Sequence, residues 1–112
     1  MATTYSYDGG LYTYTYTGLT ASDNGDRISM SQGFGLVGCV QAFSGGGTGF
    51  NSGTVTIQVS NDGTNWATLK DLQGTEIAFT DDGLSDFSTA AQYIRPSCDA
   101  NVGDVDVIIG FP

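Results

Sequence analysis

Residues 11–17 alternate between tyrosine and threonine after the opening leucine, which places Tyr12, Tyr14 and Tyr16 on one side of the chain. A period of two residues is that of a β-strand, whose successive side chains point to opposite faces. Tyrosine keeps a polar hydroxyl that needs water or a hydrogen-bond partner, so this face is expected to be partly exposed to solvent. The pattern therefore predicts a strand with one aromatic face.

The rest of the chain repeats this design, with short apolar or alternating runs bounded by glycine, asparagine and aspartate. No window of about 11 to 18 residues has helical apolar spacing that is free of glycine. Short strands at intervals of about 8 to 12 residues are typical of an all-β protein. We predict an antiparallel β-sandwich, jelly-roll-like, with about eight strands. The expected strands cover residues 11–17, 27–31, 34–43, 54–60, 64–69, 75–80, 84–88, 91–96 and 104–111.

A chain of 112 residues has room for a single domain. We expect residues 1–10 to form an extended N-terminal arm and residues 11–112 to form the sandwich. The glycine-rich segment 44–53 is expected to be a long mobile loop, and Phe50 within it either tucks back onto the domain or is offered to a partner. The structural core is expected to include Val55, Ile57, Val59, Trp66, Leu69, Tyr93 and Ile94.

The charge balance excludes several classes of function. The chain has twelve acidic and three basic residues, which gives a formal net charge of −9. Nucleic-acid binding depends on lysine and arginine, so no nucleic-acid partner is expected. The chain has no histidine, which removes the commonest general base and a common metal ligand. We therefore expect no enzyme activity, no catalytic residues, no metal site and no cofactor.

The N-terminus lacks a basic start followed by an apolar run, so a protein made in the cytoplasm is expected. The longest largely apolar stretch, residues 34–43, is far shorter than the roughly 20 residues that span a membrane, so no membrane partner is expected. Cys39 and Cys98 are either two free thiols or a single bridge that closes a long loop.

Several motifs in the second half of the chain carry a resemblance to a known group. They are Ser60-Asn-Asp-Gly-Thr-Asn-Trp66, then Leu69, Gly74, Phe79-Thr80, Gly83-Leu84 and Tyr93-Ile-Arg-Pro96. In this order and spacing the chain, over residues 53–110, resembles small all-β capsid decoration (cement) and head-surface proteins of tailed bacteriophages. A pattern S-x-D-G-x-x-W with a later Y-I-R also occurs in discoidin-like carbohydrate- and lipid-binding jelly rolls.

The resemblance implies a structural virion protein on the outer surface of a phage head. Such a protein binds the major capsid protein, stabilises contacts between its subunits, and self-associates, with a trimer favoured and a dimer possible. The alternative is a carbohydrate-binding or fibre module of a phage or bacterial surface protein. Arg95 is expected to pair with a carboxylate within the chain or across an interface. Judged by the character of their segments, the candidates for capsid or subunit contact are Tyr5, Tyr7, Tyr12, Tyr14, Tyr16, Phe50 and Arg95.

Overall fold

The computed structural model describes residues 2–30 and 37–112, and the regular elements in these ranges are all β-strands. Position 31 of the strand expected at 27–31 and positions 34–36 of the strand expected at 34–43 lie outside the described residues. The strands are β1 (Ala2–Asp8), β2 (Leu11–Leu19), β3 (Ile28–Ser29), β4 (Val37–Ser44), β5 (Val55–Ser60), β6 (Ala67–Thr68), β7 (Ala78–Phe79), β8 (Gly83–Ser88), β9 (Tyr93–Cys98) and β10 (Val105–Phe111).

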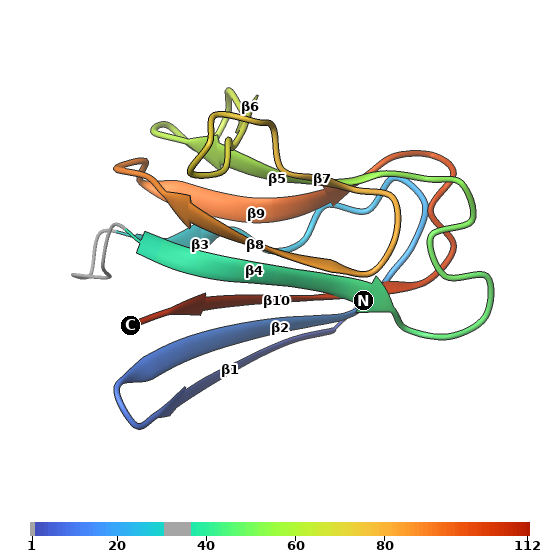
Figure 1. Cartoon of the computed structure of the whole chain (residues 1–112), viewed down its shortest axis with the longest axis horizontal. Helices are drawn as coiled ribbons and strands as arrows, with labels where there is room; N and C mark the ends of the chain where they lie inside the picture. Colours follow the sequence, from blue (N-terminus) through green and yellow to red (C-terminus); the bar gives the residue numbers. More distant parts are fainter. Residues whose placement is uncertain (1, 31–36) are drawn as a thin grey trace.

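The strands form two antiparallel sheets that pack face to face (Figure 1). Sheet A has the order β1-β2-β10-β4-β8, and sheet B has the order β3-β9-β5-β6, with β7 also paired to β5. From β2 onward the chain crosses repeatedly between the sheets, as in a jelly roll. The predicted sandwich is confirmed, and it has ten strands because β1 joins sheet A in addition to the nine expected segments.

The core lies between the sheets, and β10 supplies its centre. Val105, Val107, Ile109 and Phe111 point inward at alternate positions and are fully buried. The ring of Phe111 meets the ring of Phe87 edge-on, with centroids 5.8 Å apart. Sheet B contributes expected core residues that the structure confirms as buried, namely Val55, Ile57, Leu69 and Ile94.

Three other residues expected in the core lie at its margin or outside it. Val59 is partly buried and packs against the core from the side. Tyr93 is half-buried on the outer face of sheet B, because the inward positions of β9 are Ile94 and its alternate neighbours. Trp66 is also half-buried and lies just before β6. Both aromatic rings are covered by arginines instead: Arg27 lies 4.5 Å from the Tyr93 centroid, and Arg95 lies 4.0 Å from that of Trp66.

The turn between β5 and β6 is built around Asp62. Its Oδ1 accepts hydrogen bonds from the backbone N–H groups of Thr64 and Asn65, both at 2.8 Å. Ser60 Oγ accepts from the N–H of Gly63 at 2.9 Å, and Gly63 takes a φ of +75° that favours glycine. The first motif of the resemblance is thus a self-supporting turn. The backbone donor on Asn65, then that on Thr64, holds the pKa of Asp62 well below its usual range.

Within the segment expected as an arm, residues 2–8 are extended and are paired with β2. The register runs from Ala2 opposite Thr17 to Asp8 opposite Leu11. Glycines at positions 9 and 10, with φ of +60° and +86°, close the hairpin, as a two-residue turn with positive φ requires. Residues 2–8 are therefore the edge strand of sheet A.

Tyr16 is fully buried, whereas the sequence predicts that the tyrosine face of this strand is partly exposed to solvent. Its hydroxyl donates a 2.6 Å hydrogen bond to the backbone carbonyl of Asp26, so the polar tip has a partner inside the protein. Burial, followed by the nearby Asp26 charge, raises the pKa of Tyr16 far above its usual value. Tyr16 therefore anchors the loop before β3 to sheet A.

Removing this hydroxyl tests the anchor. Tyr16→Phe is expected to lower the free energy of unfolding by about 1 kcal/mol, because the Asp26 carbonyl loses its partner while the ring stays packed. Chemical denaturation measures the change. Tyr5→Phe removes a hydroxyl from an exposed tyrosine and is the matched control, expected to stay near wild type; equal effects of the two variants would contradict the anchoring role.

The Asp62 turn predicts a pH dependence. A carboxylate with a lowered pKa stabilises the fold above its unfolded pKa of about 3.9, and this contribution is lost as the pH falls below that value. Asp62→Asn is expected to lower the thermal midpoint at pH 7, with a difference from wild type that shrinks as the solution is acidified through pH ~4. Asp8→Asn removes the same formal charge far from this turn and corrects for net charge. A difference that is constant with pH would contradict this account.

Candidate functional site: an apolar groove on sheet A

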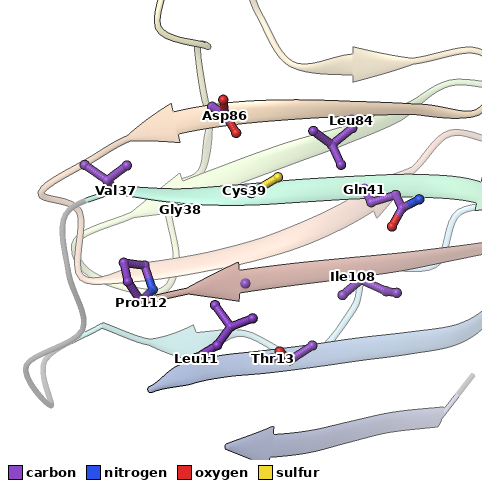
Figure 2. A pocket seen from close by; sticks show the side chains of 11 residues that line it. Leu11, Thr13, Val37, Gly38, Cys39, Gln41, Leu84, Asp86, Ile108 and Pro112 are labelled. Carbon is purple, nitrogen blue, oxygen red and sulfur yellow. The ribbon is translucent and has the colours of Figure 1, made fainter. Parts of the chain in front are cut away.

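The outer face of sheet A carries an open apolar groove of about 500 Å³ (Figure 2). Its side chains come from four neighbouring strands, β2, β10, β4 and β8, and from the last residue of the chain. The lining consists of Leu11, Thr13, Val37, Gly38, Cys39, Gln41, Leu84, Asp86, Ile108, Gly110 and Pro112.

The strand register brings these residues together. Gln41 of β4 lies opposite Ile108 on one side and Leu84 on the other, so the three share the outer face. Two residues earlier in β4, Cys39 lies opposite Gly110 on one side and Asp86 on the other. Gly110 has no side chain, so nothing from β10 fills the groove at this position. The rim is exposed: Leu84 shows 63% of its surface to solvent.

The groove is nearly uncharged. Asp86 is the charged residue of its lining, and the Cys39 thiol lies beside it. Burial, followed by a hydrogen bond to Asp86 and its charge, raises the pKa of the Cys39 thiol. The thiol therefore stays protonated at neutral pH and is a poor nucleophile. Such a surface is suited to covering an apolar side chain, with a cation beside Asp86, rather than to bond making.

Sequence reasoning missed the groove, although one signal was present. The run Val107-Ile108-Ile109 breaks the alternation of β10 and puts an isoleucine on a face where a polar residue is usual. Apolar side chains on both faces of a strand indicate that both faces are packed against something other than water. The other groove residues carry no such local signal, because a single exposed leucine or valine is ordinary.

The tyrosines predicted for contact divide into two groups. Tyr5, Tyr7, Tyr12 and Tyr14 form one cluster on the inner side of the β1–β2 hairpin, with Tyr7–Tyr12 and Tyr5–Tyr14 ring centroids 4.5 and 4.8 Å apart. Tyr5 and Tyr7 are 53% and 57% exposed, because β1 lies at the rim of sheet A, away from the β5–β9 pair (Figure 1). Tyr16, on the same face, is buried and is not available for contact.

The other two predicted contact residues, Phe50 and Arg95, both make contacts within the chain. Phe50 tucks back into the core and is 7% exposed. The segment expected as a long mobile loop makes successive turns around it, with Gly49 N–H donating to the Gly46 carbonyl and Gly53 N–H to that of Phe50. Arg95 donates from Nε to Gln58 Oε1 at 3.0 Å rather than to a carboxylate, while its guanidinium stacks on Trp66.

Both cysteines are free thiols. Cys98 is buried, and burial together with the charges of Asp23 and Asp99 raises its pKa to about 11. Within residues 2–30 and 37–112, no group of three or more histidine, cysteine, aspartate or glutamate side chains is arranged to hold a metal ion. The same part of the chain contains no helix long and apolar enough to cross a membrane.

Comparison of the sequence with family models and with curated proteins gives no match. Among solved structures, the SPBc2 prophage-derived protein YomS is similar in fold, with a TM-score of 0.64. The sequences are 14% identical, and the match covers 90% of this chain and 93% of that chain. The likeness extends over nearly the whole sandwich and, at this identity, shows a shared fold.

Two glycines of the groove test its geometry. A Cβ at Gly110 meets nothing closer than 3.8 Å, so Gly110→Ala is expected to stabilise the protein by about 0.4 to 1 kcal/mol through the unfolded chain. A Cβ at Gly38 points inward and lies 2.6 Å from Phe87 Cζ, so Gly38→Ala is expected to cost about 1 to 3 kcal/mol. Denaturant unfolding of both variants measures this; the reverse order would contradict the assigned faces.

Proposed function

We propose that this chain is a structural protein of a bacteriophage particle and decorates the outer surface of the head. It binds the major capsid protein there and stabilises contacts between capsid subunits. The observation that carries this proposal is the exposed apolar groove on sheet A. The resemblance of the second half of the sequence to decoration proteins, and the shared fold with a prophage-derived protein, support the phage context.

The groove suggests how attachment works. Burying an apolar side chain contributes about 1.5 to 3 kcal/mol, which suits a surface rich in leucine, isoleucine and valine. Asp86 and the net charge of −9 favour a capsid segment that carries lysine or arginine next to its apolar residue. A protein that binds only the assembled shell stabilises that shell by mass action. No chemical step is required, so we infer a non-enzymatic role.

The same charge favours a place on the outside of the shell. A protein with so few cations is repelled by the packaged genome, so no nucleic-acid partner is expected. Synthesis in the host cytoplasm, followed by docking on assembled heads, fits this proposal.

Leu84→Asp tests the groove. Removing a leucine that docking would bury, and adding a charge beside Asp86, is expected to weaken binding to shells of the encoding phage's major capsid protein at least ~10-fold, which corresponds to about 1.4 kcal/mol. Co-sedimentation with the shells measures the affinity. Leu72→Asp is the matched control: Leu72 is 57% exposed, lies outside the groove and receives the same charge. Its binding is expected to stay at the wild-type level.

Equal binding of the two variants, or no binding of the wild type, would contradict the proposal. The alternative, a carbohydrate-binding or fibre module, is favoured by the exposed rings of Tyr5 and Tyr7, since such rings can stack on sugars. Trp66 is less suited, because Arg95 already lies against its ring. Glycan-array binding that persists in Leu84→Asp and is lost in Tyr7→Ala would establish that alternative.

A further inference from the structure

Two of the three cations of the chain, Arg27 and Arg95, stack on aromatic rings at the outer face of sheet B and have no carboxylate partner. The described part of the chain includes all twelve acidic residues, and none of them forms an ion pair with either guanidinium. Burial lowers the pKa of Arg95, because its charge is partly withdrawn from water. An anion that compensates this charge must therefore come from outside the described chain.

Two carboxylates come near Arg27 in the sequence or in the fold, and both bond elsewhere. Asp26 precedes Arg27, but its Oδ2 accepts a 3.1 Å hydrogen bond from Thr3 Oγ1 of sheet A. Asp62 belongs to the β5–β6 turn, and its Oδ1 accepts from backbone N–H groups of that turn. Neither carboxylate is in ion-pair contact with Arg27.

Arg95 is held in one orientation by two contacts. Its Nε donates to Gln58 Oε1 at 3.0 Å, and its guanidinium carbon lies 4.0 Å from the centroid of the Trp66 ring. Gln58 lies opposite Arg95 in the β5–β9 ladder, so the two side chains share the outer face. The end-on pair of N–H groups, one on each Nη, makes no hydrogen bond within the described chain. This fork matches the two oxygens of a carboxylate, and fixing it in advance lowers the entropy cost of binding.

Arg27 adds a second guanidinium to the same patch. Its carbon lies 4.5 Å from the centroid of Tyr93, which is two residues from Arg95 in β9. Alternate residues of a strand share a face and lie about 7 Å apart, so the two stacked cations belong to neighbouring positions. Arg27 also contacts the β5–β6 turn, where a Cβ added at Gly63 would overlap its Nη1. The turn that leads into Trp66 therefore also positions Arg27.

We propose that Arg95 and Arg27, stacked on Trp66 and Tyr93, form a binding site for a single carboxylate that an aspartate or glutamate of a partner protein supplies. The carboxylate takes the end-on fork of Arg95, and Arg27 adds a second positive charge beside it. Sheets A and B lie on opposite sides of the core, so this site faces away from the groove (Figure 1). The inference therefore goes beyond the proposed capsid attachment and does not rest on it.

The net charge selects the kind of anion. At −9, the protein repels polymers whose negative charges repeat along the chain, such as nucleic acids and acidic polysaccharides. A doubly charged phosphate is opposed more strongly by the same field than a carboxylate is. An isolated carboxylate among neutral or basic groups meets the least repulsion, and a polypeptide segment can present one in this way.

An NMR titration of the full chain tests the site, because Trp66 is the sole tryptophan and gives a single indole signal. The probe is the blocked tripeptide acetyl-Gly-Glu-Gly-amide at low salt, and acetyl-Gly-Gln-Gly-amide is the matched control. The glutamate peptide is expected to shift the Trp66 indole and Arg95 Nε–H signals saturably and to bind at least ~10-fold more tightly than the glutamine peptide. Added salt is expected to weaken it. Equal affinities, or no saturable shift with the glutamate peptide, would overturn the proposal.

Three variants separate the guanidinium fork from net charge. Arg95→Lys keeps the charge but loses the planar fork, and it is expected to bind the glutamate peptide at least ~5-fold more weakly. Arg27→Gln, at an exposed position, is expected to bind it about 2- to 5-fold more weakly. Lys70→Gln removes the same charge from an exposed residue that stacks on neither ring, and it is expected to bind like the wild type.

Wild-type affinity in Arg95→Lys, or equal weakening in Arg27→Gln and Lys70→Gln, would overturn the proposal. Glucuronate and inorganic phosphate, titrated in the same way, distinguish other sources of the anion. Both are expected to bind no more tightly than the glutamate peptide. Tighter binding of glucuronate would assign the site to an acidic sugar, and tighter binding of phosphate would assign it to a phosphoryl group; either result would overturn the proposed protein carboxylate.

Discussion

The pairing of β10 between β2 and β4 is the constraint on which the rest of the structure depends. Val107 lies opposite Tyr16 on one side and Ala42 on the other, and all three are buried. The alternate residues, Ile108 and Gly110, form the floor of the outer groove. One strand therefore defines both the core and the candidate site, and shifting its register by one residue would exchange the two faces.

Period-two alternation and turn residues predicted the sandwich because both are local signals. The same reasoning placed Trp66 and Tyr93 in the core, where it failed for a physical reason. An aromatic ring next to a buried strand position can be covered either by the opposite sheet or by a cation, and Arg95 and Arg27 supply that cover here. The groove was not predicted because its leucines and isoleucine come from separate strands, and only the register brings them together.

For the strand of alternating tyrosines, the sequence predicts which side chains share a face of the sheet but not how deeply each one is buried. The alternation of residues 11–17 correctly put Tyr12, Tyr14 and Tyr16 on one side, and β1 adds Tyr5 and Tyr7 to that side. Burial along this face depends on how far sheet B extends over it, which no local pattern records. Tyr16 lies under cover and bonds to Asp26, whereas Tyr5 and Tyr7 lie at the uncovered rim. The predicted face was therefore correct, and burial removes Tyr16 alone of these three from the candidates for contact.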